Sequence, residues 1–339
     1  MGLHLIALCW SAALGVDPLR WRPRASAWVS AALVVLGACS PAQAPPLRVA
    51  TIPWPGYESV HLAQSLGLLD AKQIRLVELV SASQTSKSLR SGAVDAAMLT
   101  LDETLLLLQE GSDLRVVLVM DISHGADVVM ARPGITTLED LRGKRIAVET
   151  GAIGALMLDA LLTAAGLSAA DIQVIDMPVN EHEDAYRKGL VDAVVTFEPA
   201  RTALLNRGAR ILFDSSRIPG RIIDVLVVRA EAVDSHAPAL RALAAAHFNA
   251  LDHLARQPQD AAARLAPFLH VDPAQVLPQF LGIKLPDLAE NRVQLTGSPP
   301  PLARKAAELS DFMVRQRLLR TSVDVSRIVD PRFLPAAAP

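Results

Sequence analysis

The chain has 339 residues, 51% of them hydrophobic and 20% charged, which is enough to build a sizeable core in more than one lobe. Its 33 basic and 35 acidic residues give a net charge of −2, and no dense stripe of Lys and Arg occurs. Aromatic side chains that might stack on bases are few. This composition argues against a nucleic-acid-binding protein.

The N-terminal region has the pattern of a bacterial lipoprotein signal. Arginines precede an apolar segment that is too short to span a membrane and that ends in small residues. The tetrapeptide 36–39, Leu-Gly-Ala-Cys, resembles the lipobox, in which the cysteine carries lipid after cleavage. We expect residues 1–38 to be a signal peptide, Cys39 the lipidation site and 39–46 a tether. The alternative is an apolar leader with an incidental cysteine.

A pattern of glycine, Val-Asp-Ala and an apolar run occurs twice, from Ser91 to Glu103 and from Lys188 to Pro199. An apolar run without polar alternation is typical of a parallel strand covered on both faces. Each copy ends in a carboxylate, Asp102 or Glu198. Ligands of open α/β sheets bind at the carboxyl ends of such strands. The two copies predict two similar α/β lobes with a ligand cleft between them.

Three further candidates follow the first two strands of the first lobe. Trp54 and Tyr57 lie on a rigid turn after the first strand, where they can wall a ligand; alternatively, Trp54 is a core residue at the sheet edge. Gln84 lies near a helix start, where free N–H groups suit a ligand oxygen. For the neighbouring Ser83 and Thr85, helix capping alone is a sufficient explanation. The helix dipole likewise offers an alternative explanation for Asp102 in a first helical turn.

Polar groups also mark the points where the chain passes between the two predicted lobes. Ser123 and Asp127 interrupt two apolar segments, and Asp224 precedes another apolar strand. Thr150 and Gly151 form a small-residue turn at a helix start, which exposes backbone N–H groups. Their spacing fits neither a dinucleotide fingerprint nor a P-loop. All five residues are therefore candidates for ligand contact.

The two crossings divide the chain into lobes. We expect a discontinuous lobe of 47–131 plus 225–339 and an inserted lobe of 132–224, an arrangement that permits hinge closure. From residue 235 onward the sequence is rich in Ala and Leu and predicts helices.

The residues after the predicted signal peptide show no Ser-His-Asp order, no metal-ligand cluster, no cofactor loop and no nucleophilic cysteine. We therefore expect no metal and no cofactor, and binding rather than catalysis. Two alternatives stay open. One is a small-metabolite enzyme in which Glu198 and Asp102 form an acid–base pair, and the other is a ligand-sensing lipoprotein, which would share all these features.

Taken in order, the segments resemble the nitrate/sulfonate/taurine-type family of substrate-binding proteins of ABC importers. The resemblance lies in WPGY at 54–57, GAVDAAMLTLDE at 92–103, SHGAD at 123–127, DLRGKRIAVETG at 140–151, GLVDAVVTFEP at 189–199 and DSSRIPGRIIDVLVV at 214–228. It implies an α/β, two-lobe type II periplasmic-binding-protein fold and a monomer in the periplasm, anchored to a bacterial membrane by lipid. The implied partners are a small molecule, an ABC permease and its ATPase. The resemblance leaves the ligand open.

The charge of the expected cleft adds a prediction about the ligand. Four carboxylates point toward it, and the nearest basic candidate is Arg221; the acids are Asp102, Asp127, Glu198 and Asp224. An acidic cleft repels anions, so the residues favour a cationic or neutral nitrogen-containing ligand, with Trp54 and Tyr57 available for cation–π contact. Salt-bridge partners on neighbouring helices would weaken this argument.

Overall fold

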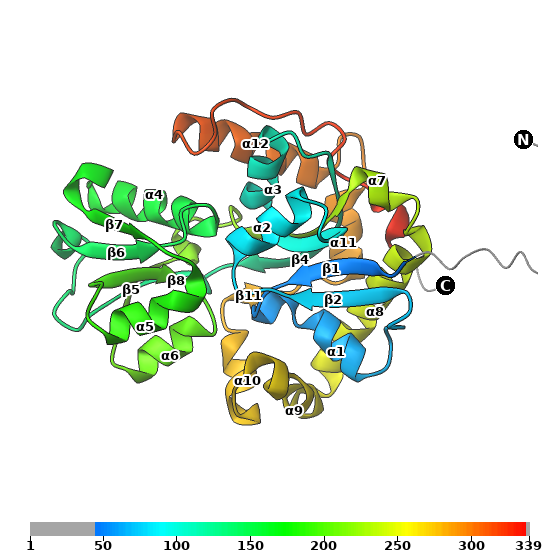
Figure 1. Ribbon diagram of the computed structural model, residues 1–339, viewed down its shortest axis with the longest axis horizontal. Coiled ribbons are helices and arrows are strands. Elements are labelled where there is room, and N and C mark those ends of the chain that lie inside the picture. The colour runs from blue at the N-terminus through cyan, green and yellow to red at the C-terminus, as the bar shows by residue number, and fades with distance from the viewer. Residues whose placement is uncertain (1–44, 337–339) are drawn as a thin grey trace, which may run out of the picture. The chain divides into compact units, whose positions relative to one another are not determined.

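The computed structural model describes residues 45–336. The predicted signal peptide, the lipidation site Cys39 and most of the tether lie outside these residues. The described residues belong to one compact unit and contain two β-sheets, each with its own helices (Figure 1). We call each sheet with its helices a lobe.

The first sheet has six strands, and one of its central strands, β10, is formed after the chain returns from the second lobe. Strands β2, β1 and β3 are parallel, whereas β10 and β4 pair antiparallel beyond β3. The order across the sheet is β2 (Ile74–Glu78), β1 (Leu47–Thr51), β3 (Ala96–Thr100), β10 (Ile223–Arg229), β4 (Leu114–Ser123) and β11 (Ile283–Lys284).

The second sheet has five strands with a matching arrangement. Strands β7, β6 and β8 are parallel, and β5 and β9 pair antiparallel beyond β8. The order is β7 (Gln173–Asp176), β6 (Arg145–Val148), β8 (Ala193–Thr196), β5 (Val128–Ala131) and β9 (Arg210–Asp214). Each sheet therefore has three parallel strands followed by two that each pair antiparallel with the strand before, as the sequence repeat predicts for two similar lobes, and the first sheet has β11 in addition.

Helices cover both faces of each sheet, which explains why the central strands are apolar throughout. Neighbouring residues of one strand, such as Met98 and Leu99, enter different cores on opposite faces. The first lobe has α1 (Ser59–Ser65), α2 (Ala82–Arg90), α3 (Leu101–Gln109), α7 (Ala230–Val233), α8 (Ala237–Arg256), α9 (Pro258–Leu269), α10 (Pro273–Gln279), α11 (Leu288–Leu295) and α12 (Pro301–Arg315). In the second lobe, α4 (Ile153–Ala165) lies on one face, with α5 (His182–Arg187) and α6 (Ala200–Asn206) on the other (Figure 1).

The repeated Val-Asp-Ala pattern has a structural role in both lobes. Asp95 accepts hydrogen bonds from the backbone and guanidinium of Arg48, and Asp192 accepts the same set from Arg145. In return, the backbone N–H of each aspartate donates to the backbone oxygen of its arginine. The aspartate therefore fixes the start of one central strand against the start of its parallel neighbour.

Replacing Asp192 with Asn is expected to lower the free energy of unfolding by about 1 kcal/mol, because a half-exposed charged pair with several hydrogen bonds contributes modestly. Asp184→Asn, which alters an exposed surface pair, is the matched control and should change stability less. Urea denaturation of both variants measures the difference. Equal stability of the two would show that this strand contact is unimportant.

The lobe boundaries differ from the predicted ones at two strands. Strand β5 was expected in the first lobe but pairs with β8 and β9 of the second sheet. Asp224 was expected in the inserted lobe but pairs with Thr100 and Asp121 of the first sheet. The chain thus crosses just before Val128 and just before Ile223. Both strands are apolar on both faces, so their sequence carries no sign of which sheet they join.

Within residues 45–336, no helix combines the length and the apolar character needed to cross a membrane.

Candidate functional site

The topology places the functional ends of both sheets against each other. In the first lobe, the carboxyl ends of β1, β3 and β4 and the amino end of β10 share one edge, as the pairing of Asp224 with both Thr100 and Asp121 shows. The second lobe has a corresponding edge, where the carboxyl ends of β6 and β8 lie beside the amino end of β5 and Val128 pairs with Thr196. This is where open α/β sheets bind ligands.

Two small cavities, which we call the inner cavities, lie where these edges meet. One has a volume of about 20 Å³ and is lined by Ile52, Trp54, Tyr57, Ala82, Thr100, Asp127, Ile153, Phe197 and Asp224. The other has about 10 Å³, and Asp127, Ile153 and Phe197 line it as well. Spaces of this size hold at most about one water molecule. A solute can therefore reach this position only when the lobes move apart.

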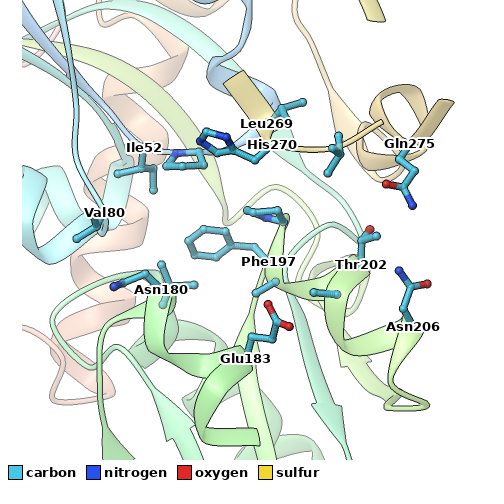
Figure 2. A pocket seen from close by; sticks show the side chains of 16 residues that line it. Ile52, Val80, Asn180, Glu183, Phe197, Thr202, Asn206, Leu269, His270 and Gln275 are labelled. Carbon is cyan, nitrogen blue, oxygen red and sulfur yellow. The ribbon is translucent and has the colours of Figure 1, made fainter. Parts of the chain in front are cut away.

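A larger groove of about 470 Å³ opens beside the inner cavities. Its walls come from both lobes, and Ile52 and Phe197 line both this outer groove and the first inner cavity. Figure 2 shows the Phe197 ring pointing into the groove between Ile52 and Glu183, with His270 on the side of Ile52. The volume is typical of small-molecule pockets. Phe197 therefore separates an open groove from a buried polar centre.

Aromatic side chains form one wall of the inner cavities. The rings of Trp54 and Phe197, from different lobes, meet edge to face with centroids 5.4 Å apart. Trp54 Nε1 donates a hydrogen bond to Asp121 Oδ2 over 3.0 Å, and the Tyr57 hydroxyl bonds to Asp224. Trp54 and Tyr57 are buried but still border a cavity. Their position therefore agrees in part with each of the two predictions, a wall of the ligand site and a core residue.

The polar centre is a group of five buried carboxyl groups with shifted pKa values. Burial raises the pKa of Asp102 to about 6 and those of Asp121 and Asp127 to about 7. Burial, with the charge of Asp102, raises the pKa of Glu103 to about 8. Burial, with the charge of Asp121, holds the pKa of Asp224 well above its ordinary value. Near neutral pH the site is thus poised between protonated and charged states.

Two carboxylates, Glu103 of this group and Glu149, connect the lobes by reaching helix starts of the opposite lobe. Glu103 Oε1 of α3 accepts the backbone N–H of Ile153 at the start of α4, over 3.1 Å. Glu149 Oε1, which follows β6, accepts the backbone N–H of Ser83 in the first turn of α2, over 2.8 Å. Carboxylates are favoured at helix N-termini by the free N–H groups and by the dipole. We call these contacts the cross-lobe carboxylate bonds.

Several predicted site residues meet at the centre of the structure. Trp54, Tyr57, Asp127 and Asp224 line the first inner cavity. Asp102 is buried beside them: its charge raises the pKa of Asp127, and its Oδ1 has no hydrogen-bond partner among the described residues.

Ser123 supports the crossing rather than lining a cavity. Its hydroxyl lies 2.8 Å from that of Ser215 on the returning segment and accepts the backbone N–H of Asp127 over 3.3 Å. It therefore positions Asp127.

Three other predicted contacts and the expected basic neighbour lie elsewhere. Gln84 is exposed, and its Oε1 accepts the backbone N–H of Val80 in its own turn. Thr150 is exposed and bonded to Asp176. Glu198 is buried against Arg201 and Thr202 within the second lobe. Arg221, the expected basic neighbour, lies over the ring of Phe312, away from the inner cavities.

At Gly151 a glycine is needed for close packing between the lobes. A Cβ at this position would come within 3.2 Å of Ser83 Oγ in the opposite lobe. Glycine here allows the close approach that the bond from Ser83 to Glu149 requires.

Sequence reasoning missed Asp121, Glu149 and Phe197 as site residues and named Glu103 only as a helix-start acid. Asp121 and Glu149 end apolar strands, as Asp102 nearly does, so the strand-end rule that found Asp102 could have found them too. Phe197 carried no such signal because it continues the apolar run of β8.

Two apolar-walled, mixed α/β lobes joined by two crossings, with a polar centre between facing strand ends, define a type II periplasmic-binding-protein fold. Comparison with known proteins agrees with this class. The NMT1-like family matches residues 40–269, and the chain belongs to that family.

Individual relatives are more distant. A protein of Escherichia coli (strain K12) named for binding aliphatic sulfonates is 28% identical over 285 residues, 80% of this chain and 86% of its own length. The taurine-binding periplasmic protein of the same organism is 23% identical over 265 residues, 75% of this chain and 81% of its own.

Among solved structures, the alkanesulfonate-binding protein of Xanthomonas axonopodis pv. citri bound to MOPS superposes with a TM-score of 0.73 at 22% identity, covering 85% of this chain and 99% of its own. At this identity the likeness shows the fold alone.

Proposed function

We propose that the protein is the extracytoplasmic solute-binding component of an ABC importer, which captures a small nitrogen- or sulfur-containing metabolite by closure of its lobes and delivers it to a permease driven by its ATPase. The observation that carries this proposal is the meeting of strand ends from both lobes around buried polar groups, in a chain of the NMT1-like family. The sulfonate-binding and taurine-binding relatives support a small organic solute. They also support binding without chemical conversion.

A lipid anchor on Cys39 belongs to the same proposal. The arginine-flanked apolar segment and the Leu-Gly-Ala-Cys tetrapeptide support it. A monomer tethered in the periplasm would release its solute to a permease in the adjacent membrane. Labelling cells with a fatty acid tests the anchor, because label should enter the wild-type protein and be lost in Cys39→Ala.

Thermal unfolding with a panel of solutes tests the importer function. The panel includes nitrate, sulfonates, taurine, pyrimidines and primary or quaternary amines. A specific ligand at 100 to 1,000 times its dissociation constant should stabilise the protein by about 3–4 kcal/mol through mass action, which raises the melting temperature by several degrees.

The fate of the ligand separates this function from its alternatives. A binding protein returns the solute unchanged after long incubation, as mass spectrometry of the released solute would show. Conversion of the solute would instead favour an enzyme. Unchanged solute combined with failure to stimulate the ATPase of any importer, and capture of a membrane receptor, would favour a ligand-sensing lipoprotein.

A further inference from the structure

We propose that the solute carries a cationic nitrogen, an organic ammonium or a protonated amidine or heterocycle, which binds at the inner cavities with Asp127 as its main counter-charge. This inference rests on the proposed function and specifies the ligand class of the same site.

The backbone hydrogen-bond donors at the helix starts, which would serve an anion, are already in use. The backbone N–H of Ile153 donates to Glu103, and that of Ser83 donates to Glu149. The second oxygen of Glu149 accepts the N–H of Val179 over 3.2 Å. The helix starts that face the centre are thus bonded to the chain's own carboxylates. A sulfonate would have to displace these carboxylates before it gained comparable donors.

Hydrogen-bond acceptors, by contrast, are left over. Asp127 is 4% exposed, its Oδ2 has no partner among the described residues, and it lines both inner cavities. The buried oxygens Asp102 Oδ1 and Asp121 Oδ1 also lack partners there. Leaving such groups unsatisfied is costly. The unpartnered Asp127 therefore points to a ligand that brings donors, independently of the number of acids around it.

The charges around Asp127 agree with a cation. No Lys or Arg of residues 45–336 lines either inner cavity. His182, which lines the second one, is held neutral because burial lowers its pKa, and its Nε2 contacts the Met177 carbonyl over 3.2 Å. Arg201 is engaged by Glu198. An anion would meet uncompensated carboxylates, whereas a cation would find a counter-charge in a site of low dielectric.

The nature of the walls favours an organic cation. Trp54, Tyr57 and Phe197 line the first inner cavity, and aromatic faces attract ammonium groups. In residues 45–336 no group of three or more His, Cys, Asp or Glu is arranged to hold a metal ion. The outer groove, which shares Ile52 and Phe197 with this cavity, offers room for an apolar body attached to the cationic head.

The test is a series of probes that share one body and differ in the charge of the head group: benzylammonium, benzyl alcohol and phenylmethanesulfonate. Isothermal titration calorimetry uses the full-length protein in mild detergent at pH 8, where Asp127 is ionised. Benzylammonium is expected to bind at least tenfold more tightly than the alcohol, and phenylmethanesulfonate more weakly than either.

Two further measurements locate the effect. Asp127→Asn should lower the affinity for benzylammonium at least tenfold and leave the affinity for benzyl alcohol unchanged. Asp140→Asn, which alters an exposed aspartate of the second lobe, should change neither affinity. The affinity of the wild-type protein for benzylammonium should fall as pH drops below about 7, because the proton then competes for Asp127. The titratable groups that face Asp127 are Tyr57, Asp102, Glu103, Asp121, Glu149, His182 and Asp224.

The charge series and the pH dependence need no variant, so the inference stays testable even if Asp127→Asn does not fold. Tighter binding of phenylmethanesulfonate than of benzylammonium would overturn the inference and leave the importer function standing. Unchanged benzylammonium affinity in a folded Asp127→Asn would also overturn it. Binding of no probe at all would count against both the inference and the proposed function.

Discussion

Raising the pH from 6.5 to 8.5 is expected to destabilise the ligand-free protein by about 3 kcal/mol and to lower its melting temperature by about 5 °C. The cause is the buried carboxyl group cluster at the centre of the site. In an unfolded chain such groups titrate near pH 4. In the folded protein, burial raises the pKa of Asp121 and Asp127 to about 7 and that of Glu103 to about 8.

The direction follows from the number of bound protons. Between pH 4 and the raised pKa values, the folded state holds protons that the unfolded state has released, so stability falls as pH rises through this interval. Below pH 6.5 a second effect opposes it, because burial lowers the pKa of His247 to about 4 and folding then excludes a proton. Between pH 6.5 and 7.5 the unfolded chain loses the rest of this imidazolium proton, and above about pH 7.5 His247 is neutral in both states. The carboxyl groups therefore dominate the pH dependence from 6.5 to 8.5.

Thermal unfolding across this window, followed by circular dichroism, gives the measurement. Asp121→Asn should flatten the pH dependence, since the amide oxygen can still accept the bond from Trp54 Nε1 but no longer titrates. Asp113→Asn removes an exposed aspartate whose pKa is lowered by Arg115, and should leave the slope unchanged. A melting temperature that stays level or rises with pH would show that these carboxyl groups are ionised or neutral in both states alike.

The repeat in the sequence was a reliable guide to the lobes because its cause is local. The aspartate pairs with an arginine of the neighbouring strand, Asp95 with Arg48 and Asp192 with Arg145, and the glycine of each copy, Gly92 or Gly189, has a positive φ. The same pattern predicted that Asp102 follows a strand end that faces the cleft. It required no knowledge of the partner lobe.

The errors come from side chains that bond within their own segment and from main-chain contacts that the sequence pattern does not show. Glu198 follows a strand as Asp102 does, but it turns to Arg201 and Thr202 on its own helix, so strand position alone cannot tell a ligand carboxylate from a structural one. Gln84 bonds to its own turn, while the adjacent Ser83 offers its backbone N–H to Glu149 of the other lobe. The element that contacts the opposite lobe is thus a main-chain group, for which side-chain identity carries no signal.

Replacing Glu149 with Gln is expected to shift the lobes toward an open arrangement by about tenfold or more. Glu149 bonds to Ser83 N–H at the start of α2 and to Val179 N–H of its own lobe. A hydrogen bond to a buried charged group contributes about 1.5–3 kcal/mol, and only the first of the two bonds is lost when the lobes part. The amide retains one acceptor, so it cannot satisfy both N–H groups.

Double electron–electron resonance between spin labels, one on each lobe, should show the population at long distance increase in Glu149→Gln. Glu181→Gln, an exposed residue of the same lobe, is the control and should leave the distances unchanged. If the bond between Glu149 and Ser83 competes with an anionic solute for the same helix start, the variant should also bind phenylmethanesulfonate better than the wild type does. If the bond serves only to hold the lobes together, the affinity of the variant for every solute should fall by the same factor. Each solute must then supply the free energy of closure alone. Unchanged distances would contradict a role for this carboxylate in closure and would leave the bond from Ile153 to Glu103 and the contact between Trp54 and Phe197 to hold the lobes together.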